Sequence, residues 1–268
     1  TAIIELELSM SGSTAKKIVL LIDGHLRDLS VKGAYESWAE RLDTDTSNYD
    51  EFLFGMLVQA VFSGGMKGQI VDAAMPVLKN ACFGWNINKV ASLTESDLKE
   101  IANIPGAIGN MPKLRVMRDN AKKVLNLQES FGSFSNFLKS FSSVDQLADA
   151  LSNNKSKFKF KYIANVTVYD FLRNTGFASI KPDRHVMRFF QRIGLLSEPA
   201  TEQLTITTAS QFASNAGIAL PILDGLIYLF CGDRPDVVRF ATCGAVPICE
   251  KCPIIDYCKH YQSKKGKR

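Results

Sequence analysis

The sequence has no hydrophobic run long enough to cross a membrane. The apolar run Ile18–Ile22 is too short, since a membrane-spanning helix needs about 20 apolar residues. The run Gly217–Phe230 is interrupted by Pro221 and Asp224. The N-terminal residues also lack the basic and apolar regions of a secretory signal. These absences predict a protein of the cytoplasm, associated with the nucleoid, or of the nucleus.

The alternating pattern of β-strands is nearly missing as well. Only Gln203–Thr208 alternates weakly, ahead of a helix predicted from Ala209. Elsewhere apolar residues recur with helical spacing, and the nearly continuous apolar run Phe52–Phe62 predicts a buried central helix. The polar stretch Asp43–Asn48 predicts a linker. The fold class is therefore all-α, with further helices predicted at Gln69–Ala81, Glu95–Ala102 (capped by Thr94 or Ser96), Lys113–Leu127, Ser133–Phe141 and Val144–Leu151.

Acidic residues are scarce between Leu151 and Arg192, where nine basic residues accompany two acids, Asp170 and Asp183. Such a surface suits a polyanion whose phosphates are held by Lys, Arg and backbone N–H groups. Asp183 follows a proline and precedes a run with helical apolar spacing. It is predicted at a helix start, either as an ordinary N-cap or as a carboxylate available for chemistry, and the local sequence leaves both open.

Cysteines are few but clustered. Two of the six, Cys82 and Cys231, have apolar neighbours and are predicted to be buried thiols. In a reducing compartment, the other four favour a metal site over disulfides. Only one pair has the C-x2-C spacing of a zinc knuckle, so the wide outer spacings favour a [4Fe–4S] cluster, with zinc as the alternative. These four form the pattern C-x5-C-x2-C-x5-C and are Cys243, Cys249, Cys252 and Cys258.

Helices, an aspartate at a helix start and a compact four-cysteine loop together resemble the helix-hairpin-helix DNA glycosylase superfamily. Endonuclease III and the adenine glycosylases of that superfamily carry such a loop, with one more residue in the first spacing. The resemblance implies a two-lobed helical fold with a C-terminal [4Fe–4S] cluster, and Asp183 as the catalytic carboxylate. It implies a domain of residues 49–180 that includes a hairpin at 160–177, and a lobe of residues 181–268 with the cluster loop at 243–258. Residues 1–48 would be an extension packing with that lobe.

The middle of the chain resembles the bacterial 3-methyladenine DNA glycosylase I family. In that family a glutamate and a tryptophan flanking a Gln-Ala-x-x-Ser segment help to recognise the base. This chain has Met56 and Gly64 at those positions, which weakens the expectation of 3-methyladenine as the substrate. The residues that carry the resemblance are Gln59-Ala60 with Ser63, Asn110 with Lys113, Asn120-Ala121, Phe131–Phe134 and above all Phe160–Phe177.

The resemblance also implies how DNA would be held. The hairpin usually contains G-x-G, and here Ala164 and Asn165 are expected to make the tight turn, since asparagine tolerates left-handed geometry. Gln59 or the segment Ser63–Lys67 would be the wedge that fills the space left by the flipped base. The expected DNA-binding residues are Gln59, Lys161, Ile163, Ala164, Asn165, Val166, Thr167, Lys181 and Arg184, and the expected base-pocket aromatics are Phe62, Tyr162 and Trp85. Each of these basic residues could instead belong to a solvated face, and each aromatic to the core.

Bifunctional members of the superfamily use a lysine that would fall near Asn165 or Val166. No lysine stands at either position, so the sequence predicts a monofunctional glycosylase without AP-lyase activity. Its partner would be double-stranded DNA carrying a damaged base, with alkylated purines as the substrate class, and the protein would act as a monomer. The alternatives are a catalytically silent DNA-binding iron–sulfur module and an electron-transfer protein.

Overall fold

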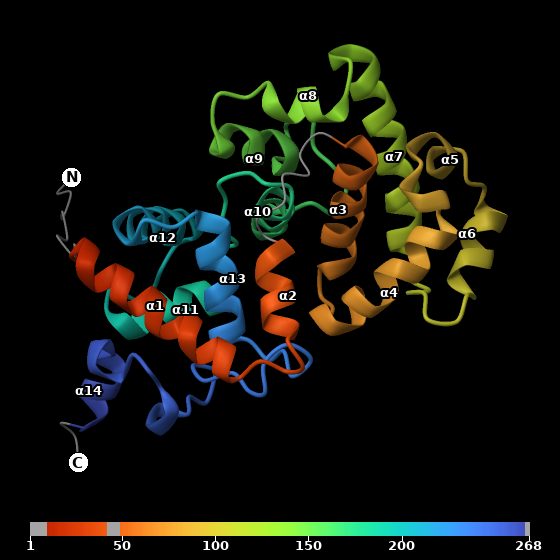
Figure 1. Cartoon of the computed structure of the whole chain (residues 1–268). Helices are drawn as coiled ribbons and strands as arrows, with labels where there is room; N and C mark the ends of the chain where they lie inside the picture. The colour runs from red at the N-terminus through yellow and green to blue at the C-terminus, as the bar shows by residue number, and fades with distance from the viewer. Residues whose placement is uncertain (1–9, 42–48, 266–268) are drawn as a thin grey trace. The chain divides into compact units, whose positions relative to one another are not determined.

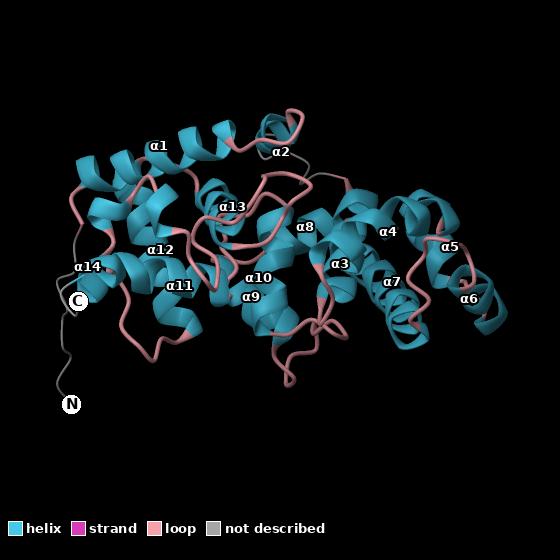
Figure 2. Cartoon of the chain, turned by 90° about the horizontal axis from the view of Figure 1, so that it is seen from below, coloured by secondary structure: helices cyan, strands magenta, loops and turns pink. Residues whose placement is uncertain are grey.

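The computed structural model describes residues 10–41 and 49–265, so the predicted linker Asp43–Asn48 lies outside it. Its elements are helices joined by loops (Figure 2). Within the described residues the one β-type pairing is an isolated antiparallel bridge between Ser30 and Val238. The all-α prediction is confirmed. The chain divides into two compact units, unit 1 (Thr1–Thr44 with Ile180–Arg268) and unit 2 (Asp45–Ser179).

Unit 2 is built around α3 (Asp50–Ser63), which packs against α4, α7, α8 and α10 (Figure 1). Leu53, Phe54, Leu57 and Phe62 on α3 are all fully buried. The predicted buried central helix is therefore confirmed. The other helices of this unit are α4 (Gly68–Ala81), the 3-10 turn η1 (Phe83–Trp85), α5 (Ile87–Ala91), α6 (Glu95–Ala102), α7 (Met111–Phe131), α8 (Phe134–Lys139), α9 (Val144–Ser152) and α10 (Asn165–Asn174).

Gly55 gives α3 room for the indole of Trp85. A Cβ at Gly55 would lie 2.7 Å from Trp85 Cδ1 and 2.8 Å from Nε1. The indole also meets Phe54 edge-on, with ring centroids 6.4 Å apart. We expect Gly55→Ala to lower the free energy of unfolding, measured in urea, by about 1–3 kcal/mol because it overpacks this contact. Gly24→Ala is the control: Gly24 is an exposed helical position with nothing within 4 Å, where alanine should stabilise by about 0.5–1 kcal/mol.

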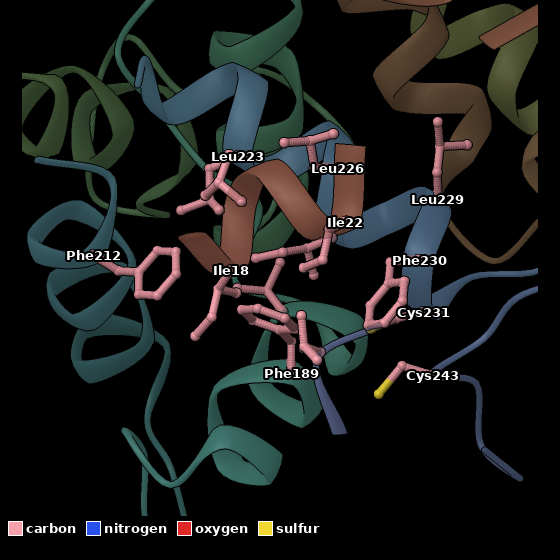
Figure 3. Close-up of a cluster of buried hydrophobic side chains, with 14 of the residues drawn as sticks. Ile18, Ile22, Phe189, Phe212, Leu223, Leu226, Leu229, Phe230, Cys231 and Cys243 are labelled. Atoms are coloured by element: carbon pink, nitrogen blue, oxygen red, sulfur yellow. The ribbon is translucent and has the colours of Figure 1, made fainter. Parts of the chain in front are cut away.

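Unit 1 packs α1 (Gly12–Asp28) against α12 and α13, and α11 against α13. Figure 3 shows Ile18 and Ile22 of α1 among Phe189, Phe212 and Leu223. The run with helical apolar spacing predicted after Asp183 forms the buried face of α11, made of Val186, Phe189, Phe190 and Ile193. The helices of this unit are α1, α2 (Ala34–Arg41), α11 (Arg184–Ile193), α12 (Glu202–Ala216), α13 (Leu220–Cys231) and α14 (Lys259–Lys265), with 3-10 turns η2 (Cys249–Lys251) and η3 (Ile255–Tyr257).

The weakly alternating segment Gln203–Thr208 is helical, which corrects the prediction that the helix starts at Ala209. The Thr201 side chain accepts the N–H of Leu204 and starts α12 there. Thr205, Ala209 and Phe212 are buried, and their spacing of four and three residues fits one face of a helix. No single described helix is long and apolar enough to cross a membrane, and the pair α12 and α13 passes that test only together, across a bend of 106°.

Candidate functional site

Asp183 is the N-cap of α11, so the predicted helix start is confirmed. Its Oδ1 accepts the backbone N–H groups of His185 at 2.7 Å and Val186 at 3.3 Å. Within the described residues no hydrogen bond reaches its Oδ2, and the side chain is half-buried. A helix N-terminus favours negative charge. One carboxylate oxygen is thus held in place while the other is available to a ligand.

The loop before Asp183 is fixed by Asp224, a residue that the sequence marked only as a break in an apolar run. Asp224 lies on α13 with 3% of its surface exposed. Its Oδ1 accepts the backbone N–H of Lys181 at 2.8 Å, and the Asp183 N–H donates to the Lys181 carbonyl at 2.7 Å. A buried carboxylate therefore sets the path of the chain into the helix start.

His185 ties the first turn of α11 to the end of α13. Its Nδ1 lies 3.1 Å from the Cys231 carbonyl oxygen, and because a carbonyl can only accept, Nδ1 carries the proton. Burial lowers the pKa of His185, although the negative Asp183 acts in the opposite direction. The imidazole is a hydrogen-bonded, largely buried group, which fixes the helix rather than supplying a free acid or base.

The hairpin in unit 2 is clamped from α7 by Asn120, which is 2% exposed. The Asn120 amide accepts the Lys161 N–H and donates to the Lys161 carbonyl, both at 3.1 Å. The left-handed residue is Tyr162, with φ of 61° and 53% of its surface exposed. The turn expected at Ala164 and Asn165 was wrong, because the clamp on Lys161 places the chain reversal at the next residue, and Asn165 already begins α10.

The start of α10 offers unoccupied N–H donors. Ala164 is its N-cap and makes no side-chain hydrogen bond. In the described part of the chain, the N–H groups of Asn165, Val166 and Thr167 have no acceptor, as expected for a first helical turn. The N–H of Ile163, by contrast, donates to the Phe160 carbonyl at 3.4 Å, and the Ile163 side chain is buried. The arrangement can therefore bind an anion through residues 165–167.

The basic residues near the hairpin and the helix start differ in their surroundings. Lys161 Nζ forms a 2.7 Å ion pair with Asp119 Oδ2, although the lysine side chain is 64% exposed. Lys159 Nζ donates to the Ile163 carbonyl at 3.1 Å and braces the hairpin from inside. Arg184 is exposed and Lys181 half-buried. Lys161 and Arg184 therefore offer charge at the surface of their respective units.

Of the three aromatic residues predicted for a base pocket, only Tyr162 is exposed. Phe62 is fully buried and Trp85 is 6% exposed, so both contribute to the core of unit 2. Gln59 is half-buried, and its Nε2 donates to Asp72 Oδ1 at 3.2 Å. Asp72 was not foreseen, because it lies on the next helix and no local pattern marks it. Of the three predicted pocket aromatics, Tyr162 alone is therefore accessible at the surface of unit 2.

The four clustered cysteines differ in burial. Cys243 and Cys258 are buried, and Cys249 and Cys252 are half-buried. Figure 3 shows Cys243 beside Phe230 and Cys231. A hydrogen bond with Cys231 and the Arg192 guanidinium lower the pKa of Cys243 to about 6, against the effect of burial. Burial raises the pKa of Cys252 to about 12.

Both ends of the cysteine loop contact the last turn of α11. Arg192 Nη1 donates to the Cys243 carbonyl at 2.8 Å and lies 3.2 Å from Cys243 Sγ. Gly194 ends the helix with φ of 78°, and the side chain of Lys259, next to Cys258, leaves no room for a Cβ there. Within residues 10–41 and 49–265, no group of three or more His, Cys, Asp or Glu side chains is arranged to hold a metal ion.

The sequence profile of one family, described as methyladenine glycosylase, matches residues 36–202, more than half of the chain. This chain belongs to the methyladenine glycosylase family. It is accordingly a DNA-binding N-glycosylase of base excision repair, as the sequence resemblance implied.

Solved structures show the same fold class. The 8-oxoguanine glycosylase/lyase of Methanocaldococcus jannaschii, solved with DNA containing 8-oxoguanine, has 17% identity and a TM-score of 0.52, over 80% of this chain and 96% of its own. The 8-oxoguanine DNA glycosylase of Thermotoga maritima has 19% identity and a TM-score of 0.51, over 82% and 98%. The 3-methyladenine DNA glycosylase I of Staphylococcus aureus has 24% identity and a TM-score of 0.43, over 47% and 76%. The first two confirm the helical glycosylase fold.

Proposed function

We propose that this protein is a monofunctional DNA glycosylase that hydrolyses the N-glycosidic bond of an alkylated purine flipped out of double-stranded DNA. The observation that carries the proposal is Asp183, whose Oδ1 is fixed by two backbone N–H groups while its Oδ2 makes no hydrogen bond in the described residues. As the glycosidic bond breaks, positive charge develops on the deoxyribose. A preorganised carboxylate stabilises that charge and can orient the attacking water.

DNA would be held through its backbone near the flipped base. The free N–H groups of residues 165–167 suit phosphate oxygens, and Lys161, Lys181 and Arg184 would add positive charge. The segment Ser63–Lys67, or Gln59 one helical turn before it, would be inserted into the duplex as the wedge. Tyr162, exposed on a strained turn, would stack against DNA, since aromatic faces bind bases.

The absence of a lyase lysine supports simple hydrolysis. Asn165 and Val166 stand where bifunctional members of the superfamily place that lysine. The two lysines nearest in sequence have other partners: Lys161 pairs with Asp119, and Lys159 holds the Ile163 carbonyl. Both amines are therefore engaged, and neither is available to attack the sugar.

The substrate would differ from 3-methyladenine in size or hydrogen bonding. Met56 cannot make the hydrogen bonds of a carboxylate. Gly64 has space around it, since a Cβ there would meet nothing nearer than the Val61 carbonyl at 3.7 Å. An alkylated purine bulkier than 3-methyladenine fits both changes. The protein would act on genomic DNA as a monomer, in the nucleoid or the nucleus.

A [4Fe–4S] cluster would be held by Cys243, Cys249, Cys252 and Cys258. The residue types suit a cluster, because thiolates are the ligands of such clusters and Arg192 places a cation 3.2 Å from Cys243 Sγ, which favours the thiolate. In the described residues the four thiols are not gathered into a metal-binding group, so the proposal rests on their pattern in the sequence. When bound, the cluster would supply a crosslink between the loop and the lobe around it. The residues of the chain, not the cluster, would perform the hydrolysis.

Base release tests the proposal. Duplexes carrying 3-methyladenine, 7-methylguanine, hypoxanthine, uracil, 8-oxoguanine, an etheno-purine or thymine opposite guanine would be incubated with the protein, and free bases identified by mass spectrometry. We expect release of an alkylated purine without strand cleavage. Release of another base would correct the substrate class, and strand cleavage would contradict monofunctional action. No release, together with tight binding to undamaged DNA, would favour a silent DNA-binding module.

A further inference from the structure

Lys113, near the start of α7, has an ammonium group buried at the end of α3. The residue is 7% exposed, and Nζ donates to the Phe62 carbonyl at 2.7 Å and the Gly64 carbonyl at 2.6 Å. Lysine is almost never this buried unless it is paired with an opposite charge. Here its partners are backbone carbonyls, and burial lowers its pKa. Keeping a cation at this position costs free energy, which calls for a role.

The carbonyls that Lys113 binds belong to the turn that ends α3. A helix end leaves its last four carbonyls without helical partners. Here the Gln59 carbonyl accepts the Ser63 hydroxyl at 2.8 Å and the Ser63 carbonyl accepts the Met66 N–H at 3.3 Å. Lys113 holds the carbonyls of Phe62 and Gly64, on either side of Ser63.

Two glycines make this turn depend on such a brace. Gly64 and Gly65 follow the helix, and Gly65 has φ of 76°. Glycine has the widest conformational freedom of any residue, so a Gly-Gly turn without external hydrogen bonds samples many backbone paths. Lys113 binds the Gly64 carbonyl directly and thereby favours one backbone conformation of the turn.

We propose that Lys113 is a positioning residue for base release: it holds the Ser63–Gly65 turn, and with it the surface segment Ser63–Lys67, in the conformation that enters the DNA. This inference rests on the proposed function, which makes that segment the wedge. Gln59, the other wedge candidate, is held separately through Asp72, so Lys113 acts on the segment Ser63–Lys67. Its ammonium is no catalytic acid here, since both observed bonds go to backbone carbonyls.

Lys123 supplies a matched control on the same helix. Its Nζ donates to the Lys157 carbonyl at 2.7 Å, and burial lowers its pKa as well. A Lys123→Met change removes the same chemistry, an ammonium on a backbone carbonyl, at a place away from the end of α3. The two changes differ in which segment loses its brace. They also differ in burial, because Lys123 is half-buried and holds one carbonyl where the buried Lys113 holds two.

The experiment is single-turnover base release with excess enzyme, using the lesion duplex that the wild type processes. The amplitude of a parallel active-site titration with DNA reports the fraction of active enzyme, and the single-turnover rate constant reports the site itself. We expect Lys113→Met to lower the rate constant by about 10- to 100-fold, as small displacements of positioning groups do, with the amplitude kept. Lys123→Met should leave the rate constant within about 2-fold of wild type.

A Lys113→Met rate constant equal to that of the wild type, with only a loss of amplitude or melting temperature, would overturn the inference and make Lys113 a structural cap. If Lys113→Met fails to fold by circular dichroism, Lys113→Arg takes its place. Arginine keeps the charge but is larger and planar, so in a buried space that holds one ammonium it displaces the two carbonyls. Its rate constant should also fall, and an unchanged one overturns the inference. A wild type that releases no base overturns the proposed function and this inference together.

Discussion

Asp183→Asn is expected to lower the single-turnover rate of base release by at least about 100- to 1,000-fold, the loss typical of a group that stabilises charge in a transition state. Asparagine keeps the shape of the side chain and an oxygen for the N–H groups of His185 and Val186. What it removes is the negative charge facing the deoxyribose. Mass spectrometry of the freed base, after rapid mixing, measures the effect.

The helix-capping role of Asp183 separates from its chemistry in the same experiment. Asparagine and aspartate are about equally good N-caps, so the melting temperature of Asp183→Asn should stay close to that of the wild type. Asp183→Ala removes the cap as well and should cost about 1 kcal/mol of stability. DNA affinity, measured with an abasic-site analogue, should be unchanged or higher in Asp183→Asn. An Asp183→Asn enzyme with wild-type rate would reduce this residue to a cap.

If the proposed cluster is bound by the four cysteines, the wild type should contain about four iron atoms per chain, and Cys252→Ser is expected to contain nearly none. Serine is a poor ligand for iron compared with a thiolate. Since the free energy of metal binding adds to that of folding, the variant should also melt several degrees lower. Iron analysis, visible absorption and thermal denaturation under anaerobic conditions measure these changes.

Cys231→Ala is the matched control for the cluster. Cys231 is buried beside Cys243 and hydrogen-bonded to it, yet it lies outside the four-cysteine pattern. Its loss should leave the iron content intact. Loss of iron in Cys231→Ala would show that Cys231 is a ligand. If the wild type, purified anaerobically, contains zinc and no iron, the four cysteines form a zinc site and the proposed cluster is wrong.

Several features of this chain were set by short-range interactions, and these could be predicted. Thr94 starts α6 through a capping box with Asp97, and Asp183 starts α11. Each motif involves residues two or three positions apart, so it forms without any tertiary contact. The buried stripe of α11 and the central position of α3 follow in the same way from apolar spacing. The wrong prediction for the start of α12 shows the limit of such local patterns, because six residues with weak alternation fit either a strand or a helix.

The contacts that shape the candidate site are long-range, and only the tertiary structure decided them. Asn120 clamps Lys161 from 41 residues away, Lys113 reaches Phe62 across 51, and Asp224 holds Lys181 across 43. A buried polar group must find a partner, but its sequence neighbours do not say which one. By itself the sequence determined the helices, the cysteine pattern and the position of Asp183. The packing of the helices decided which backbone carbonyls and N–H groups those side chains fix, because that depends on which faces of distant helices meet.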